Sequence, residues 1–362
     1  MATGSLTKTD RFINILLLAL LLLQGISGIV MLYGTWQPWV FDLHRIVGIP
    51  LLVLAPWKVA VIYRSLLRGM NKSFDRSVIV LLSVVFAHLI LLVVILGFLW
   101  MWRLGPYSIL GQTLLSWHWI LGLLLLPFIA IHVLWRWPNP SKRDFLTRRD
   151  FLKVLGLTGA GIVGARLAAY VAEARSTEQI PRRTVTGSRA FGIYSGNDFP
   201  VVGESPPSLD LESWRLEIRG AVHTPLQVGY QGILAPRPYV LAATLDCTNG
   251  WYSIQDWQGL PLIALLNEAG MLDGAAGVRL ISATGYNHSY PMQEARKILL
   301  ATHVTGETLS PQHGFPLRAV VPDRRGWFWV KWLTGIVVLE SPGEVIGGIL
   351  ASPREVLRQW QG

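Results

Sequence analysis

The chain has 362 residues, of which 51% are hydrophobic and only 15% charged, whereas soluble proteins average about 25% charged residues. Its net charge is +10, but the cations gather in short runs beside apolar segments. This is the pattern of a membrane protein and argues against a nucleic-acid partner. The single cysteine, Cys247, excludes an intrachain disulfide.

Four apolar segments fill the first part of the chain. They run over residues 12–33, about 43–63, 77–100 and 114–135. Each reaches the roughly 20 residues that an α-helix needs to cross about 30 Å of hydrocarbon. We therefore expect an all-α bundle of four membrane spans within a first domain of residues 1–140.

The loops between these segments predict their orientation. The loop after the second span and the segment after the fourth carry most of the nearby cations: Arg64, Arg68, Lys72 and Arg76, then Arg136, Lys142, Arg143, Arg148, Arg149 and Lys153. The loops after the first and third spans contain only Arg103 between them. Because basic loops stay inside, the N-terminus and both basic regions should face the cytoplasm, in a multi-pass protein of the cytoplasmic (inner) membrane.

Four of the eight histidines lie inside or at the edges of the spans: His44, His88, His118 and His132. Ionisable residues in membrane helices are rare and are usually functional. His118 and His132 are 14 residues apart, so they share one helix face at a separation of about 21 Å. This spacing resembles the ligand helix of di-haem membrane b-type cytochromes.

The resemblance implies one or two haem b groups. His44 opens the second span on its outer side, at about the depth of His118, so this pair could bind one haem iron from both faces. The inner pair fits less well, because His88 is near the middle of its span and His132 lies further inward. His88 and His132 therefore either bind a second haem, or His88 makes a hydrogen bond to a neighbouring helix.

Residues 147–153 read TRRDFLK and precede a mildly apolar stretch, residues 154–171. The run resembles a twin-arginine export signal and implies the twin-arginine export machinery as a partner. Basic residues are also expected after a span that ends in the cytoplasm, but the run R-R-x-F-L-K is more specific. We expect residues 141–175 to hold this segment as a retained fifth span, which places residues 176–362 on the periplasmic side.

From about Pro181 the composition shifts towards Pro, Gly, Asp and Glu. The runs SWRLEIRGAV, GVRLISAT and FPLRAVVP predict short strands with turns between them. The run LPLIALLNEAGM (260–271) predicts a short helix. Residues 176–362 should therefore form an α+β, mainly β, domain.

Three runs in this domain carry a further resemblance: SWRLEIRGAVHTPLQV, LDCTNGWYSIQDWQGLPLIALLNEAG and QHGFPLRAVVPDRRGWFWVKWLTGIVVLE. In this order they resemble the molybdopterin-binding domain of the sulfite oxidase family, which includes the periplasmic methionine sulfoxide reductase catalytic subunit. The similarity covers most of residues 190–345. It is strongest in HGFPLRAVVP and the VKWL that follows.

The resemblance implies a Mo-molybdopterin cofactor whose molybdenum is bound by the Cys247 thiolate. A soft thiolate suits such a metal, although a lone cysteine is more simply read as a small buried apolar residue. The cofactor contacts implied by matching positions are His313, Arg318, Trp329, Val330 and Lys331 and, on looser matches, Asn197 and Ser282.

The chain has other residues than sulfite oxidases at positions that those enzymes place near the substrate. Those enzymes carry arginines four and five positions after the cysteine, where this chain has Trp251 and Tyr252, and the position of their active-site tyrosine is Thr302 here. A sulfite dianion needs fixed positive charge, so an aromatic wall favours a neutral sulfoxide or N-oxide. Arg324 and Arg325 either form an exposed basic turn or supply the missing cation.

Together these features predict a membrane-bound molybdenum oxidoreductase. Its periplasmic domain would carry out two-electron oxygen-atom chemistry at Cys247 on a small oxo substrate, and haem b would exchange the electrons with quinone or quinol. Reduction of a sulfoxide or N-oxide is the favoured direction. Two alternatives stay open: a sulfite-type oxidase, and a membrane cytochrome whose outer domain binds without catalysing.

Overall fold

The computed structural model describes residues 8–33, 38–69, 74–104, 108–135, 148–174, 186–190, 194–201 and 205–344. The chain divides into two compact units, Met1–Gly187 and Ser188–Gly362. The predicted domain boundaries after residues 140 and 175 both fall outside the described residues, so they stay predictions.

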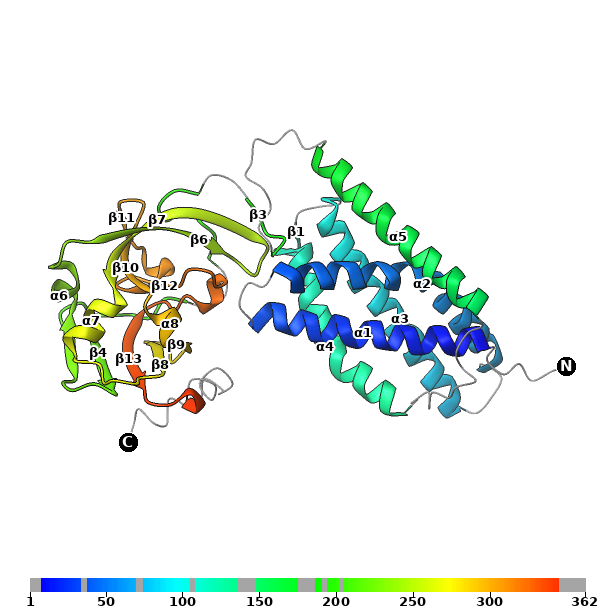
Figure 1. Cartoon of the computed structure of the whole chain (residues 1–362), viewed down its shortest axis with the longest axis horizontal. Helices are drawn as coiled ribbons and strands as arrows, with labels where there is room; N and C mark the ends of the chain where they lie inside the picture. The colour runs from blue at the N-terminus through cyan, green and yellow to red at the C-terminus, as the bar shows by residue number, and fades with distance from the viewer. Residues whose placement is uncertain are drawn as a thin grey trace. The chain divides into compact units, whose positions relative to one another are not determined.

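The first unit is helical (Figure 1). Its elements are α1 (Lys8–Tyr33), α2 (Pro38–Gly69), α3 (Phe74–Met101), a small hairpin of β1 (Ser108–Ile109) and β2 (Gln112–Thr113), α4 (Leu114–Trp135) and α5 (Arg148–Ala174). Helix α1 packs on α2 and α4, α3 packs on α2 and α4, and α5 packs on α2. The four expected helices are confirmed. By length and composition α1 to α4 are long and apolar enough to cross a membrane.

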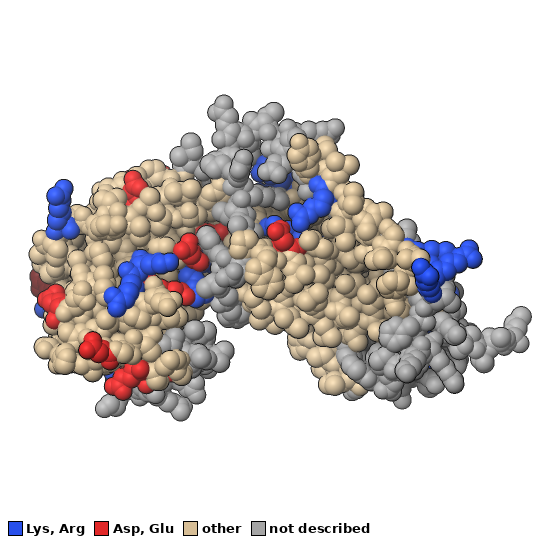
Figure 2. Space-filling model, in the orientation of Figure 1, with Lys and Arg blue, Asp and Glu red and all other residues tan. Residues whose placement is uncertain are grey.

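Apolar side chains cover the outside of this bundle. Ile26 is 61% exposed, Leu124 60% and Val163 68%. On the face shown in Figure 2, the charged side chains of the helical unit lie near its ends and the flank between them is uncharged. Because a soluble protein rarely exposes so large an apolar surface, this band is suited to lipid.

Helix α5 runs against α2 through close contacts. A Cβ on Gly161 would lie 2.7 Å from Cγ2 of Val53, so only glycine permits this approach. Nearer its C-terminal end, α5 places the Arg166 guanidinium 3.9 Å from the Asp42 carboxylate of α2. Its apolar part, Phe151–Gly164, is shorter than the other four spans. The fifth crossing therefore stays a proposal.

The second unit is mainly β, as expected. Its strands are β3 (Arg189–Ala190), β4 (Arg215–Gly220), β5 (Leu226–Gly229), β6 (Tyr239–Asp246), β7 (Trp251–Pro261), β8 (Gly277–Ser282), β9 (Asn287–Pro291), β10 (Leu299–Val304), β11 (Glu307–Thr308), β12 (Arg318–Val320) and β13 (Leu333–Leu339). Short helices join them: α6 (Tyr230–Leu234), α7 (Leu262–Glu268), α8 (Met292–Ala295), η2 (Pro311–His313) and η3 (Gly326–Phe328). Strands β4, β8 and β12 and helix α7 confirm the elements expected from the sequence.

These strands form two sheets around one core. One sheet has the order β11-β10-β7-β3, with β12 also paired to β10 and β6 to β7, and the other has the order β5-β4-β13-β8-β9. In β4 the inward side chains Leu216 and Ile218 are fully buried while their neighbours are not, as strand periodicity requires. The long antiparallel hairpin of β6 and β7 carries Cys247 in its turn, and this positions the site.

Candidate functional site

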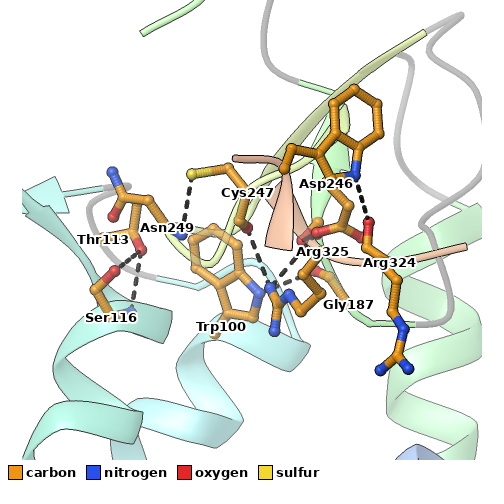
Figure 3. Close-up of polar contacts among 11 residues, drawn as sticks. Trp100, Thr113, Ser116, Gly187, Asp246, Cys247, Asn249, Arg324 and Arg325 are labelled. Carbon is orange, nitrogen blue, oxygen red and sulfur yellow. Dashed lines mark hydrogen bonds and ion pairs between the residues drawn. The ribbon is translucent and has the colours of Figure 1, made fainter. Parts of the chain in front are cut away.

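Cys247 lies in the tight turn between β6 and β7. Its N–H donates to the Trp251 carbonyl at 2.8 Å, and its carbonyl accepts from the Gly250 N–H at 2.9 Å. Gly250 has a φ of +86°, which favours glycine in this turn. The Asn249 N–H points at the Cys247 Sγ, 3.4 Å away (Figure 3). The run C-T-N-G therefore presents a thiol at the end of a rigid hairpin.

Burial raises the pKa of the Cys247 thiol. The Asn249 N–H, Arg325 and Arg318 oppose this by stabilising the thiolate, while the Asp246 carboxylate adds to it. Since metals bind the thiolate, a metal that binds here would displace the proton. The surrounding donors are placed to stabilise the charge that then forms.

Arg325 is buried beside this turn. It donates to the Cys247 carbonyl at 3.1 Å and lies 3.5 Å from the Asp246 carboxylate, and these two side chains are 7% and 0% exposed. The Ser188 hydroxyl also donates to Asp246, at 2.7 Å. The exposed-turn reading of Arg324 and Arg325 is therefore wrong, because Arg324 too is only 11% exposed. Figure 3 shows the Arg325 guanidinium between Asp246 and the Cys247 carbonyl.

Contacts with an acidic side chain and with aromatic side chains fix the loop that carries Arg325. Arg324 makes two 2.9 Å bonds to the Glu294 carboxylate. The Tyr286 hydroxyl donates to the Trp327 carbonyl at 2.5 Å and also contacts His288. Burial, and then the charge of Arg324, lowers the pKa of His288 to about 4, so this ring is neutral. These contacts orient η3 and with it Arg325.

Arg318 begins β12 and is only 5% exposed. Its guanidinium carbon lies 5.5–5.7 Å from the ring centroids of Phe199, Trp257 and Trp329. One terminal nitrogen donates to the His313 carbonyl at 2.9 Å, whereas the buried Nε finds no partner in the described segments. Burial lowers the pKa of Arg318 to about 10, and the nearby Cys247 charge opposes this. Arg318 is thus a cation at neutral pH with no carboxylate partner among the described residues.

His313 is buried, and the protein uses both of its ring nitrogens. Nε2 is 2.8 Å from the Phe199 carbonyl, and Nδ1 is 2.6 Å from the Ser310 hydroxyl. The Asn197 side chain accepts from the Ser310 N–H at 2.8 Å and donates to the Thr308 carbonyl at 2.9 Å. These two predicted cofactor residues therefore tie the 194–199 loop to η2.

The remaining predicted cofactor residues lie in the segment between η3 and β13 and at the end of β8. Trp329 donates its indole N–H to the Arg324 carbonyl, and the buried Val330 accepts from the Ala319 N–H. The Lys331 ammonium lies 4.2 Å from the Trp332 ring centroid. Ser282 ends β8 in the other sheet, where its hydroxyl contacts Thr284 at 3.1 Å. Within the described part of the chain, no contact joins Ser282 to the Cys247 turn.

An aromatic wall does stand beside Cys247. Trp251 is 3% exposed and packs against Tyr194, at 5.3 Å between ring centroids, and Phe199, at 6.1 Å. Burial raises the pKa of Tyr194, and the nearby Cys247 charge raises it further. At the family tyrosine position, the Thr302 hydroxyl is 2.8 Å from Nδ1 of its neighbour His303. Sequence reasoning missed Tyr194, which is remote in sequence from Cys247, and it missed Asp246, which is adjacent to Cys247 but whose partners Arg325 and Ser188 are remote.

In the helical unit, the structure brings His44 and His118 together. Their ring centroids are 6.0 Å apart and their planes are almost perpendicular, at 88°. His44 Nδ1 is 2.8 Å from the Ser27 hydroxyl of α1, and His118 Nδ1 is 2.7 Å from the Val93 carbonyl of α3. Since the protein engages Nδ1 on both rings, Nε2 is the atom suited to coordinate a metal.

For the inner pair, the structure describes the side chain of His88 only. His88 is exposed on α3, and its Nδ1 is 2.8 Å from the Val84 carbonyl one turn earlier in the same helix. His132 lies on α4, but its side chain is outside the described residues. The second haem therefore stays a prediction.

Comparison with known proteins identifies the second unit. Residues 203–345 match the family model described as oxidoreductase molybdopterin binding domain. The chain is 34% identical over 143 residues to the uncharacterized oxidoreductase YuiH of Bacillus subtilis, covering 38% of this chain and 72% of YuiH. This chain belongs to the oxidoreductase molybdopterin-binding family. It is therefore an enzyme of the molybdopterin-dependent oxidoreductases.

Two other relatives widen the comparison. The chain is 26% identical over 250 residues to the protein-methionine-sulfoxide reductase catalytic subunit MsrP of Gluconobacter oxydans, covering 57% of this chain and 76% of that protein. It is 28% identical over 186 residues to nitrate reductase [NADH] 2 of Phaseolus vulgaris, covering 42% of this chain. The match spans only 20% of that nitrate reductase.

The residues around Cys247 fit a molybdopterin. Near this turn, four buried donors have no partner within the described part of the chain: the Tyr194 hydroxyl, the Trp251 indole N–H, Arg318 Nε and Arg325 Nε. Buried donors are normally satisfied, so such a group indicates a site that receives acceptors. A molybdopterin is anionic and rich in acceptor atoms, and the Cys247 thiol is a soft donor of the kind that suits its molybdenum.

Proposed function

We propose that this molybdopterin oxidoreductase is a membrane-bound reductase of small sulfoxides or N-oxides that draws electrons through a haem b held by its own helices. The observation that carries this proposal is the set of buried donors around Cys247 that have no partner among the described residues, beside the aromatic wall of Tyr194, Phe199 and Trp251. Cys247 would supply the thiolate ligand. Arg318 would face the anionic part of the cofactor, and Asn197 and His313 would hold the loop that covers the site.

The bound cofactor would supply two-electron oxygen-atom chemistry. Reduction of one sulfoxide takes up two electrons and two protons, breaks the sulfur–oxygen bond and releases the sulfide and water. Oxidation of one quinol yields the same number of electrons and protons. A haem, which carries one electron at a time, would link the two reactions.

The proposed haem rests on the geometry of His44 and His118. Two imidazoles bound to one iron by bonds of about 2 Å have ring centroids about 6 Å apart, which agrees with the observed 6.0 Å. The perpendicular planes are compatible with this arrangement, because each ring can rotate about the iron–nitrogen bond. Hydrogen bonds at Nδ1 would fix both rings with Nε2 towards the iron.

The proposed topology rests on the loops and on α5. Four crossings with basic cytoplasmic loops return the chain to the cytoplasm before TRRDFLK, and a fifth crossing by α5 would put the catalytic unit in the periplasm. The contacts of Gly161 and Arg166 with α2 support a retained α5. The twin-arginine machinery, which exports folded proteins, would then export the domain with its cofactor already inserted.

The choice of substrate rests on charge. Arg325 is the cation nearest the Cys247 turn, but it is paired with the fully buried Asp246. A sulfite dianion would therefore meet little net positive charge beyond the cofactor-facing Arg318. The relative MsrP, named as a methionine sulfoxide reductase subunit, also favours a sulfoxide. Sulfite oxidation is the second candidate, because Arg318 and Arg325 are both near Cys247.

The proposal is tested on the full chain, produced with molybdate and with twin-arginine export intact. Purified protein should contain molybdenum and haem. After stoichiometric reduction, dimethyl sulfoxide or trimethylamine N-oxide should reoxidise the b-type band, and sulfite should not reduce the oxidised band. Reduction of the haem by sulfite would establish the second candidate instead, and a preparation that holds molybdenum without haem would remove the proposed electron path.

The haem ligands are tested separately. His118→Ala should abolish the b-type band while molybdenum content stays unchanged, because the two cofactors bind to different units. The matched variant His88→Ala should leave the outer haem intact and would reduce haem content only if an inner haem exists. An unchanged band in His118→Ala would remove this ligand assignment.

A further inference from the structure

Tyr194 and Trp251 form a pair of neutral side chains next to the metal-binding thiol. Their ring centroids are 5.3 Å apart in an edge-to-face arrangement, with an interplanar angle of 65°. Trp251 is directly opposite Cys247 in the β6–β7 turn, since its carbonyl accepts the Cys247 N–H at 2.8 Å. The pair is thus fixed to the same rigid turn that presents the thiol.

Both members of the pair keep a polar donor buried and unused. The Tyr194 hydroxyl and the Trp251 indole N–H are shielded from solvent, and neither has a hydrogen-bond partner among the residues that the structure describes. Leaving a buried donor without a partner is unfavourable, so two such groups on neighbouring rings point to an acceptor that binds there.

The fold holds Tyr194 in place from its other side. Three residues later, Asn197 makes side-chain bonds to Glu307, Thr308 and Ser310. Phe199 then packs on His313 at 4.1 Å between ring centroids. The loop that carries Tyr194 is therefore anchored through Asn197 and Phe199, and the Tyr194 ring packs against Trp251. These contacts fix the side chain next to the Cys247 turn.

The four buried donors near Cys247 are of two chemical kinds. Arg318 and Arg325 are cations suited to the anionic cofactor, whereas Tyr194 and Trp251 are neutral. The neutral pair is therefore the part of this donor set that suits an uncharged ligand.

We propose that the Tyr194 hydroxyl and the Trp251 indole N–H together bind the oxygen atom of a neutral S=O or N–O substrate. Each donor would supply one hydrogen bond to the oxygen that is removed in the reaction. Two neutral donors match a polar but uncharged oxygen, and they would discriminate against a sulfite dianion, which requires cations. This inference rests on the proposed function, because it names how that site selects its substrate class.

The test uses Tyr194→Phe and Trp251→Phe in the full, molybdenum-loaded chain. Tyr194→Phe removes only the hydroxyl and keeps the ring packing. The binding probe is dimethyl sulfone, a neutral S=O compound, titrated calorimetrically into the oxidised protein. Loss of one neutral hydrogen bond should weaken its binding about threefold to tenfold. Reduction of dimethyl sulfoxide should slow by roughly 10- to 1000-fold, as expected when an oxygen-binding donor is removed.

The chain offers a matched control pair in the same unit. Tyr230 packs edge-to-face on Trp214, at 6.3 Å between centroids and 84°, and the Trp214 indole N–H is likewise buried without a partner. Tyr230→Phe should leave sulfone binding, molybdenum content and turnover unchanged. An equal effect of Tyr194→Phe and Tyr230→Phe would overturn the inference, because it would show a general packing effect.

The outcomes separate this inference from the proposed function. If the wild type reduces sulfoxides and Tyr194→Phe binds the sulfone and turns over as the wild type does, the donor pair is wrong and the function stands. Loss of molybdenum in Tyr194→Phe would assign the hydroxyl to the cofactor and also overturn the inference. If the wild type reduces no sulfoxide or N-oxide, the proposed function fails, and sulfone binding still decides whether the pair binds a neutral oxygen.

Discussion

Replacing Asp246 with Asn should destabilise the catalytic unit strongly, although the change preserves shape. The Asp246 carboxylate is fully buried, lies 3.5 Å from Arg325 and accepts the Ser188 hydroxyl at 2.7 Å. Without its charge, the Arg325 guanidinium, 7% exposed, would stay buried with no compensating anion. Removing one partner of a buried ion pair costs about 3–5 kcal/mol. The 3.5 Å separation of the two charged groups places Asp246→Asn near the lower end, at about 3 kcal/mol.

The Arg324–Glu294 pair provides the comparison. Its geometry is better, with two 2.9 Å bonds, but its side chains are more exposed, at 11% and 27%. Exposed pairs contribute about 0–1 kcal/mol, so Glu294→Gln should cost about 1 kcal/mol. Asp246→Asn should therefore cost more than Glu294→Gln, because the deeper burial of the Asp246–Arg325 pair outweighs the better bond geometry of the Arg324–Glu294 pair. Thermal unfolding of the full chain in detergent, followed by tryptophan fluorescence, measures both variants.

The double variant Asp246→Asn/Arg325→Leu isolates the cause. If the cost of Asp246→Asn is the uncompensated charge of Arg325, removing that charge should recover part of the stability. The reasoning is refuted if Glu294→Gln lowers the unfolding temperature as much as Asp246→Asn does. It is equally refuted if the double variant is less stable than the sum of its single changes.

Three further predictions follow from individual contacts. Ser27→Ala removes the acceptor of the His44 Nδ1–H. The reduction potential of the proposed haem should then rise by roughly 40 mV, equivalent to about 1 kcal/mol, in a redox titration. An unchanged potential would contradict this role of Ser27. In cofactor-free protein the raised pKa of Cys247 should move the midpoint of iodoacetamide alkylation to the alkaline side of about 8.5. Since the pKa of Cys247 is higher in the folded than in the unfolded state, the stabilising effect of the bound proton is lost as pH rises through the folded-state pKa. An alkylation midpoint below the ordinary cysteine value would contradict the argument from burial. Gly161→Leu should lower the unfolding temperature of the helical unit, at a cost of about 1–3 kcal/mol, because a Cβ there meets Val53 at 2.7 Å. The control Gly156→Leu should leave the unfolding temperature unchanged, because a Cβ at that position meets nothing within 4 Å.

Local patterns account for the elements that the sequence predicts. The helices of the first unit follow from long apolar runs, because a chain in lipid must satisfy its backbone within each helix. Strands β4, β8 and β12 and helix α7 follow from periods of two and of 3.6 residues. Cys247 and Arg318 stand out through runs of neighbours rather than by themselves, which is why a family resemblance finds them when a lone cysteine would not be noticed.

Other assignments depend on contacts between remote segments. The sequence leaves Arg324 and Arg325 open between an exposed turn and a buried cation, and only packing against Glu294, Asp246 and the Cys247 carbonyl decides for burial. Tyr194 carries no signal in its own segment, because its place beside the thiol depends on Trp251, 57 residues further along the chain. Their positions are set by how the two sheets and their loops pack, which residue type and spacing do not encode.

The amino-acid sequence by itself thus determines a helical apolar unit, a mainly β unit and a cysteine within a molybdopterin-type motif. These features arise from hydropathy and hydrogen bonding along short segments. Only the tertiary structure decides that Asp246 neutralises Arg325. In the part of the chain that the structure describes, it also leaves Arg318 without a carboxylate and leaves the neutral donors of Tyr194 and Trp251 unused. Charge compensation and donor satisfaction depend on which side chains share a buried space, so they follow from the packed fold and not from any one segment of the chain.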